Sequence, residues 1–189
     1  MRFIEPQQAA KDYLLAIAKQ AIEYRLMDKA QSLNLPEQFS SLEKQAATFV
    51  TLKDRFNSLR GCIGTLQAHE PLYLSVAHNA VSAAFNDPRF APMTADEWPD
   101  IKLSISILSE PSPLLVASEQ DLKQQLNANV DGLILREGAR SATFLPSVWE
   151  DLPDKEQFLS HLKQKAGFAA DYWSDTLRFS RYQSYSFKS

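Results

Sequence analysis

The sequence predicts an α+β fold, with a mainly antiparallel or mixed sheet and flanking helices. Two observations predict it. Segments with apolar residues at helical spacing are interspersed with β-branched and aromatic runs, and two pairs of these runs are separated by short turns, as in β-hairpins, which argues against regular βαβ winding. The chain has 189 residues, of which 44% are hydrophobic. It is long enough to bury a core, so we expect residues 1–189 to form one domain.

The N-terminal third is predicted to contain a helix, a loop and a hairpin. Pro6 suits a first helical turn, and residues 32–44 are polar and loop-like. The run 48–52 is β-branched and aromatic, residues 54–58 have turn chemistry, and 59–66 resumes an extended pattern, as in a hairpin. The helix is indicated by apolar residues at helical spacing: Ala10, Leu14, Ile17, Ala21 and Tyr24.

The middle of the chain is predicted to form a second helix, a short turn and a strand. The helix covers residues 71–85 and ends before Pro88, which disfavours helical geometry at the residue preceding it. Thr94 and Glu97 have the spacing of a capping box. Residues 101–107 alternate strictly between apolar and polar side chains, which is typical of a strand in an antiparallel sheet with one wetter face.

The C-terminal part repeats the pattern of helix, hairpin, helix and strand. Asp154 is a suitable N-cap, and Gly167 suits the left-handed residue that ends a helix. The last residues alternate aromatic and polar side chains, as a strand would. The expected elements are a helix at 118–127, a hairpin of strands 133–135 and 142–145, a helix at 154–166 and a final strand at 176–187.

Composition excludes several classes of protein. The formal net charge of -3 gives no electrostatic footprint for duplex DNA or an anionic membrane. A single cysteine excludes an internal disulfide and a zinc site built from several cysteines, and it fits a reducing cytoplasm. No apolar run approaches the about 20 residues that span a bilayer, and the N-terminus lacks a signal-peptide pattern. We therefore expect a cytoplasmic protein that does not enter membranes.

Residues 59–64, Leu-Arg-Gly-Cys-Ile-Gly, are the strongest local signal for a functional site. Spacing by two puts Arg60 and Cys62 on one face of an extended segment. A guanidinium near the thiol would favour the thiolate. Gly61 and Gly64 would leave backbone N–H groups open to an anionic or carbonyl oxygen. In this interpretation Cys62 is a nucleophile or a transient carrier.

The same residues also fit a structural interpretation. Free cysteine is often buried and acts as a small hydrophobe. The two glycines would then allow only a bulge or tight packing against the following helix. Both interpretations of residues 59–64 remain open from local chemistry.

This segment resembles the signature of the AMMECR-one domain family, whose bacterial members are called AmmeMemoRadiSam system protein A. Four further segments resemble motifs of that family and occur in the same order, one with serine where the family has glutamine. The match extends from Phe49 to the C-terminus, with the N-terminal helix in place. The segments are Asp87-Pro88-Arg89-Phe90 followed by Pro92, Asp131-Gly132-Leu133-Ile134, Phe144-Leu145-Pro146-Ser147-Val148 and Lys165-Ala166-Gly167.

The resemblance implies an α+β fold with a larger and a smaller lobe and a cleft near residues 59–64. It also implies association with a Memo-like protein and a radical-SAM protein, but it supplies no settled reaction. Its DPRF segment suggests that Arg89, with Asp87, lies beside the cleft as an anion contact. The alternative is a turn in which Asp87 caps neighbouring N–H groups and Arg89 pairs with a carboxylate.

Other candidate residues carry weaker signals. His69, His78 and His161 lack metal-ligand spacing, so we expect no metal site and no cofactor; His78 as a general base for Cys62 is a weak hypothesis. The turn around Arg136 and Arg140 is predicted to be a solvated hairpin. Nucleic-acid binding is disfavoured by the acidic balance of the chain, although the tail has residues suited to base stacking and phosphate contact: Phe179, Tyr182, Tyr185 and Phe187 beside Arg178 and Arg181.

The sequence therefore predicts a ligand or substrate cleft at residues 59–64, in an enzyme or enzyme subunit that acts with Memo-like and radical-SAM proteins on an unidentified small or macromolecular ligand. Cys62 is the candidate catalytic residue. A non-catalytic binding or adaptor module with a structural Cys62 is the alternative, so the sequence leaves open whether the protein is an enzyme. The candidate ligand-binding residues are Arg60, Gly61, Gly64, Asp87 and Arg89.

Overall fold

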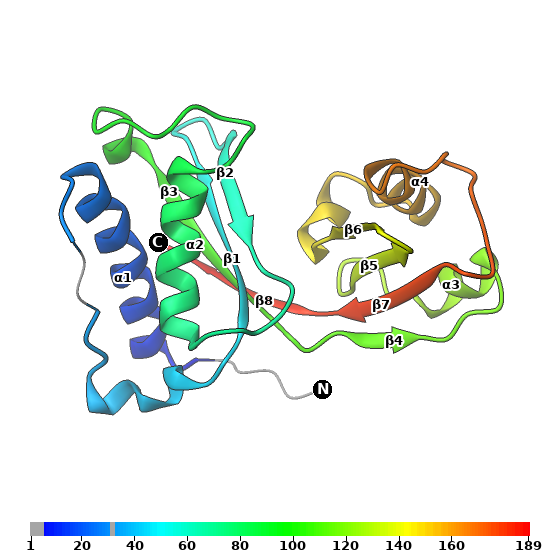
Figure 1. The fold of residues 1–189 in the computed structure, drawn as a ribbon, viewed down its shortest axis with the longest axis horizontal. Coiled ribbons are helices and arrows are strands. Elements are labelled where there is room, and N and C mark those ends of the chain that lie inside the picture. Colours follow the sequence, from blue (N-terminus) through cyan, green and yellow to red (C-terminus); the bar gives the residue numbers. More distant parts are fainter. Residues whose placement is uncertain (1–5, 31–32) are drawn as a thin grey trace. The chain divides into compact units, whose positions relative to one another are not determined.

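The computed structural model describes residues 6–30 and 33–189 and confirms the α+β class. Its strands form two four-stranded antiparallel sheets, with the orders β2-β1-β3-β8 and β4-β7-β5-β6 (Figure 1). The chain divides into two compact units: the described residues up to Leu108 together with Tyr185–Ser189 form the first, and Ser109–Ser184 form the second. The chain therefore passes between the units twice.

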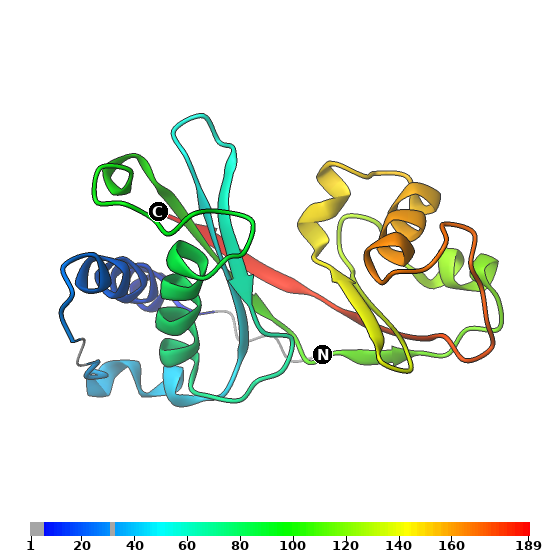
Figure 2. The same ribbon diagram turned by 45° about the horizontal axis from the view of Figure 1, so that its top comes forward.

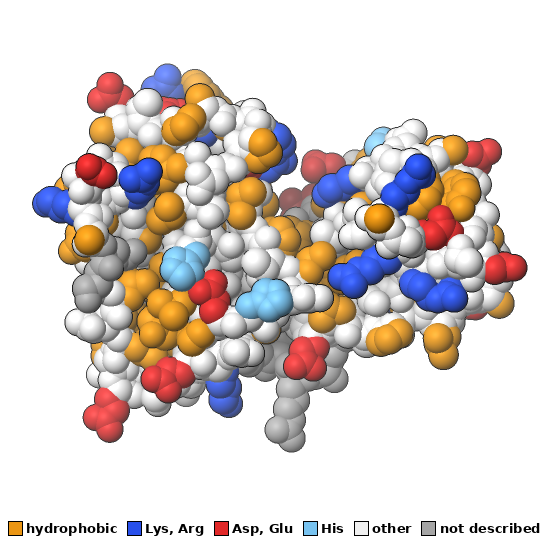
Figure 3. Space-filling model, viewed as in Figure 1, with side chains coloured by type: hydrophobic (Ala, Val, Ile, Leu, Met, Phe, Trp, Pro, Cys, Tyr) orange, Lys and Arg blue, Asp and Glu red, His pale blue; other side chains and the backbone are white. Residues whose placement is uncertain are grey.

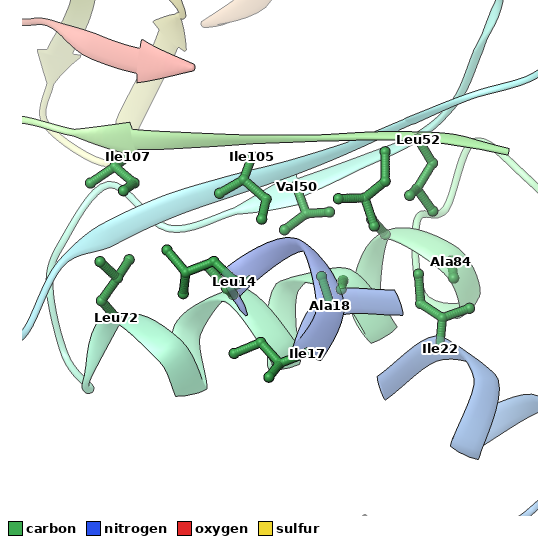
Figure 4. Packing of buried hydrophobic residues seen from close by; sticks show 14 of the residues in the cluster. Leu14, Ile17, Ala18, Ile22, Val50, Leu52, Leu72, Ala84, Ile105 and Ile107 are labelled. Atoms are coloured by element: carbon green, nitrogen blue, oxygen red, sulfur yellow. The ribbon is translucent and has the colours of Figure 1, made fainter. Parts of the chain in front are cut away.

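The first unit packs two helices on one face of its sheet (Figures 1 and 2). The strictly alternating β3 places Leu103, Ile105 and Ile107 in the core, as the sequence predicts. Figure 4 shows apolar side chains of both helices meeting those of the sheet. The elements of the first unit are α1 (Gln8–Leu26), η1 (Glu37–Glu43), β1 (Ala47–Lys53), β2 (Leu59–Gly64), α2 (Leu72–Phe85), η2 (Trp98–Asp100), β3 (Lys102–Leu108) and β8 (Ser184–Lys188).

The second unit has its own core, built around stacked aromatic rings. Trp149 and Phe158 lie with ring centroids 3.7 Å apart and both are fully buried, which contributes a large share of buried apolar area in a small unit. Its elements are β4 (Ser112–Leu114), α3 (Glu119–Gln125), β5 (Gly132–Glu137), β6 (Arg140–Phe144), η3 (Pro146–Glu150), α4 (Lys155–Lys165) and β7 (Arg178–Tyr182).

The helix caps and hairpins expected from the sequence are present. Ser118 accepts a hydrogen bond from the Asp121 N–H, and Asp154 accepts from the second and third residues of α4. Gly167 adopts the left-handed conformation, with φ +83°. These features depend on residues close in sequence, which is why the sequence alone predicted them.

Some sequence-based expectations were wrong at the level of single elements. The predicted loop at 32–44 contains the 3-10 helix η1, and its first residue lies outside the described residues. Pro6 and Pro71 precede the helices rather than lie within their first turns. The short strand β4 was not predicted.

The largest correction concerns the tail, which was predicted as one strand. It forms two strands, β7 and β8, and these belong to different sheets. Gln183 lies between them, and its backbone pairs with Ser109 at the end of β3. An alternating pattern identifies extended chain but not the sheet that it joins, because that depends on distant partners.

No helix in the described ranges is long and apolar enough to cross a membrane.

Candidate functional site

Strand β2 contains residues 59–64 and lies at the edge of the first sheet. Its register sets Gly61 opposite Leu52 and Cys62 opposite Thr51. A register shift at Leu52/Lys53 then places Leu59 opposite Lys53. The ladder is irregular at this point, and Leu59 is 40% exposed although Gly61, two residues later, faces the helices.

Both glycines of β2 are required by packing inside the unit. A Cβ at Gly61 would lie 2.1 Å from the carbonyl oxygen of Ala83 in α2. A Cβ at Gly64 would lie 2.3 Å from the Phe49 ring and from the Thr48 carbonyl oxygen. The strand therefore approaches its neighbours too closely for any side chain at these positions, in agreement with the structural interpretation of the motif.

The Asp87 carboxylate binds the outer backbone edge of β2 at Cys62. Its Oδ2 accepts the Cys62 N–H at 2.9 Å and an Arg89 Nη2 donor at 2.7 Å, and its Oδ1 accepts from Arg89 N and Nε. The hydrogen bond from the Arg89 side chain is the largest cause that holds the pKa of Asp87 far below its usual range, against its burial. Arg89 Nη2 also donates to the Cys62 carbonyl at 3.4 Å. Both backbone groups of Cys62 are therefore occupied.

Arg60 is directed at the loop after α2 rather than at the thiol. Its Nε lies 2.8 Å from Glu97 Oε1, and its Nη2 donates to the Ala91 carbonyl at 3.0 Å. The Arg60 side chain, together with the Thr94 N–H, lowers the pKa of Glu97 to about 2. The Phe90 ring lies within 5.7 Å of Arg60 Cζ and 5.5 Å of Arg89 Cζ, so it contacts both guanidinium groups. Arg60 Nη1 is buried and lacks a hydrogen-bond partner in the described part of the chain.

The cation expected beside Cys62 was Arg60, but the guanidinium that contacts Cys62 is that of Arg89, which donates to the Cys62 carbonyl oxygen. The pKa of Arg89 is raised mainly by its hydrogen bond to Asp87. In the chain that the structure describes, the thiol has one hydrogen bond, between Cys62 Sγ and Thr51 Oγ1 at 3.3 Å. The residue is half-buried.

Cys62 projects from the face of the sheet opposite the two helices. Its neighbour Ile63 packs against the helix-facing core, and successive side chains of a strand point to opposite faces. Thr51 lies opposite Cys62, and Ser104 lies opposite Thr51 on the next strand. A thiol and two hydroxyl side chains therefore form one row across three strands. We call this surface the Cys62 face.

His78 and His161 each have a hydrogen-bond partner other than the thiol. His78 Nδ1 lies 2.8 Å from Glu70 Oε2, and His161 Nδ1 is 2.8 Å from the Gln157 carbonyl. Figure 3 shows exposed histidine side chains beside an acidic side chain. Within residues 6–30 and 33–189, no group of three or more His, Cys, Asp or Glu residues is arranged to hold a metal ion.

Two of the four tail aromatics are buried and are not available for base stacking. Phe179 and Tyr182 are buried, and the Tyr182 hydroxyl is within 2.9 Å of Thr143 Oγ1. Burial raises the pKa of Tyr182. Arg181 lies 3.8 Å from the buried Asp131 carboxylate. These side chains serve the second unit's interior, so the stacking interpretation of the tail fails at Phe179 and Tyr182.

The second unit has a shallow pocket of about 400 Å³. Arg140 Cζ lies 5.0 Å from the Phe168 ring centroid, and Tyr172 stacks on Phe168 at 4.7 Å. The Tyr172 hydroxyl donates to Glu137 Oε2 at 2.9 Å. The polar groups of this pocket therefore bind one another.

Sequence reasoning missed Thr51, Phe90 and Glu97 as parts of the site. The capping-box spacing identified Glu97 as a local helix residue, and Glu97 does accept from the Thr94 N–H and hydroxyl. Its second role, pairing with Arg60, spans 37 residues. No local pattern reveals such a contact.

Comparison with known proteins gives consistent matches over nearly the whole chain. A family model described as AMMECR1 matches residues 15–187. A protein of Methanothermobacter thermautotrophicus is 37% identical over 177 residues, which cover 92% of this chain and 91% of that protein. A protein of Nanoarchaeum equitans is 34% identical over 164 residues, 86% of this chain and 90% of the other.

A solved structure has the same fold. The crystal structure of the uncharacterized protein PH0010 from Pyrococcus horikoshii superposes with a TM-score of 0.87 at 28% sequence identity. The match covers 96% of this chain and 92% of that one.

Proposed function

The chain belongs to the AMMECR1 family, a family of unknown function, and from that premise we propose that it is a cytoplasmic binding module. Its ligand site is the Cys62 face, and it acts together with Memo-like and radical-SAM proteins. In this proposal the charged residues near β2 shape the site, and they do not perform chemistry.

One observation carries the proposal: the charged groups next to Cys62 are used to hold β2 in place. Asp87 accepts four hydrogen bonds, three of them from Arg89 and one from the Cys62 N–H. Arg60 is paired with Glu97. A buried carboxylate with this many donors is fixed in its charged state and position. Such a group is suited to fixing a strand and poorly suited to exchanging protons with a substrate.

The same contacts favour binding through the sheet face over binding through the strand edge. A peptide that adds to an exposed edge needs its free N–H and C=O groups. At Cys62 these groups are occupied by Asp87 and Arg89. The side chains of Cys62, Thr51 and Ser104 are directed away from the helices and do not have this restriction.

Co-purification tests the proposal. The tagged chain is expressed with the Memo-like and radical-SAM proteins of its own genome, and each is expected to be retained. Ser104→Arg places a long side chain on the Cys62 face and is expected to reduce retention. Ser160→Arg changes a similarly half-buried serine on α4 and is the matched control. Absence of both partners from the wild-type eluate would rule out the proposal.

A second candidate is chemistry at the thiol, because two groups are suitably placed to support it. Arg89 Nη2 donates to the Cys62 carbonyl oxygen at 3.4 Å, and Thr51 Oγ1 lies 3.3 Å from the sulfur. If Cys62 is a nucleophile, iodoacetamide should alkylate it at pH 7 faster than it alkylates free cysteine. A rate equal to or below that of free cysteine would favour the binding module instead.

A further inference from the structure

Two lysines lie directly opposite each other on the Cys62 face. Lys53 of β1 and Lys102 of β3 are Cα partners in the antiparallel ladder, and both are exposed. Lys53 is two residues after Thr51 on β1, and Lys102 is two residues before Ser104 on β3, so all four side chains share one face. Like charges directly opposite each other destabilise a sheet. An acidic residue at either position would make the sheet itself more stable.

The two carboxylates next to this pair in the sequence have other partners. Asp54 Oδ1 accepts the backbone N–H groups of two residues in its own turn, at 2.8 and 2.9 Å. Asp100 is paired with Arg55 at 3.7 Å. Lys102 Nζ donates to the neutral Asn57 Oδ1 at 2.8 Å. Among the described residues, no hydrogen bond or ion pair joins Lys53 to another side chain.

The lysine pair lies close to the thiol. Two residues along a strand span about 7 Å, so the pair is one side-chain row away from the row of Cys62, Thr51 and Ser104. An anionic group held between the lysines would therefore leave the rest of a small molecule over Thr51 and the Cys62 sulfur.

We propose that the Cys62 face binds a small molecule through a carboxylate or phosphate group placed between Lys53 and Lys102. Ammonium groups suit such oxyanions as point charges, and the hydroxyls of Thr51 and Ser104 add hydrogen-bond donors next to them. The inference rests on the proposed function in taking this face as the ligand site, and it adds the chemical class of the ligand. A long polyanion fits less well, because the whole chain carries a net charge of -3.

The single cysteine of the chain allows a direct test with two alkylating reagents of similar size. Iodoacetate carries a carboxylate, and iodoacetamide is neutral. The ratio of their rates at Cys62 reports local attraction of an anion and cancels differences in thiol exposure. At low ionic strength, Lys53→Gln and Lys102→Gln are each expected to lower this ratio about threefold. The iodoacetamide rate is expected to remain within about twofold.

The matched control is Lys44→Gln. Lys44 is exposed and belongs to the same unit, but it precedes the opposite end of β1. Its ratio is expected to equal that of the wild type. A second experiment adds inorganic phosphate as a competitor. Phosphate should slow alkylation by iodoacetate more than alkylation by iodoacetamide in the wild type. This selectivity should be lost when Lys53→Gln and Lys102→Gln are combined. Phosphate selectivity without a carboxylate effect would assign the site to phosphate esters, and the reverse would assign it to carboxylates.

An unchanged ratio in both lysine variants would overturn the anion site. A Cys62 that neither reagent alkylates before unfolding would also overturn it, because the face would then be inaccessible. If either result occurred while the Memo-like and radical-SAM proteins still co-purified with the chain, the ligand class would be wrong and the binding module would stand.

Discussion

Each unit of the molecule contains buried charge, and Asp87 in the first unit and Lys163 in the second are held in different ways. In the first unit the Asp87 side chain is 2% exposed and accepts from a strand backbone and from Arg89, two residues away. In the second unit Lys163 is 1% exposed and lies 2.6 Å from Glu119, which also pairs with Lys123. The first arrangement joins a loop to an edge strand, and the second joins α3 to α4.

The difference predicts how the two charge clusters respond to substitution. Asp87 has redundant local donors, and its partner Arg89 is exposed enough to be hydrated if the pair is broken. Lys163 depends on one carboxylate and is surrounded by the unit's interior. Because an unpaired buried charge is costly, changes at the α3–α4 cluster should affect stability more, and changes at β2 should affect the Cys62 face more.

The largest effect is expected from Glu119→Gln. Burial works to raise the pKa of Glu119, but hydrogen bonds from Lys163 and Lys123 lower it. Loss of this carboxylate leaves Lys163 buried without a counter-charge, which should reduce the free energy of unfolding by about 3 kcal/mol. Urea denaturation measures the change. Glu156→Gln removes an exposed partner of Lys123 and should cost less than about 1 kcal/mol; equal effects of the two variants would contradict the comparison.

Gly61→Ala is expected to cost about 2 kcal/mol through overpacking. The new Cβ would lie 2.1 Å from a backbone oxygen of α2, so the strand and the helix must separate. Gly138→Ala is a useful comparison, since nothing lies within 4 Å of its Cβ position. Its φ of +56° still makes a side chain unfavourable by about 1 kcal/mol. Thermal unfolding of the two variants ranks them, and a Gly61→Ala protein as stable as the wild type would refute tight packing at β2.

Asp87→Asn is expected to cost about 2 kcal/mol, the loss of charge-assisted hydrogen bonds to a buried carboxylate. We also expect a local effect on hydrogen exchange. The backbone N–H of Cys62 should exchange with solvent faster, because its acceptor changes from a carboxylate to a weaker amide oxygen. Hydrogen-exchange mass spectrometry of the β2 peptide measures this. Unchanged protection at Cys62 would mean that Asp87 does not hold the strand edge.

Acid should weaken the loop that holds Arg60. The pKa of Glu97 is about 2 in the fold and 4.5 without partners. A carboxyl whose pKa is lowered by folding contributes stability above its unfolded pKa and loses it as the pH falls. The contribution of Glu97 is therefore expected to disappear between pH 4.5 and about 2, and Asp87 adds a loss in the same direction. Urea midpoints measured over this range should fall less steeply for Glu97→Gln than for the wild type.

The smallest effect on stability is expected from Cys62→Ser. The sulfur is half-buried and its one described hydrogen bond, with Thr51, can be retained by a hydroxyl. The free energy of unfolding should change by less than about 1 kcal/mol. If Ser104→Arg abolishes partner binding while Cys62→Ser leaves both binding and stability unchanged, the face is a binding surface and the thiol is not essential. A loss of several kcal/mol would instead make Cys62 a packing residue.

The sequence predicted most elements of the fold because their signals are local. Ser118, Asp154 and Gly167 each act on residues within one helical turn. Alternation over 101–107 identified the strand and its buried face, and the hairpin at β2 followed from its turn. The tail shows the limit of prediction from local signals, since β7 and β8 have the same alternating pattern but join different sheets.

The sequence by itself determined where the candidate site lies in the chain: at two glycines around one cysteine, followed by Asp87 and Arg89. Only the tertiary structure decided what each residue does there. It joined Arg60 to Glu97 and Arg89 to Asp87, filled the space at Gly61 with Ala83, and placed Lys53 beside Lys102. The physical reason is range. Caps, turns and periodicity are set by neighbours in sequence, whereas strand register and ion pairing are set by residues that only folding brings together.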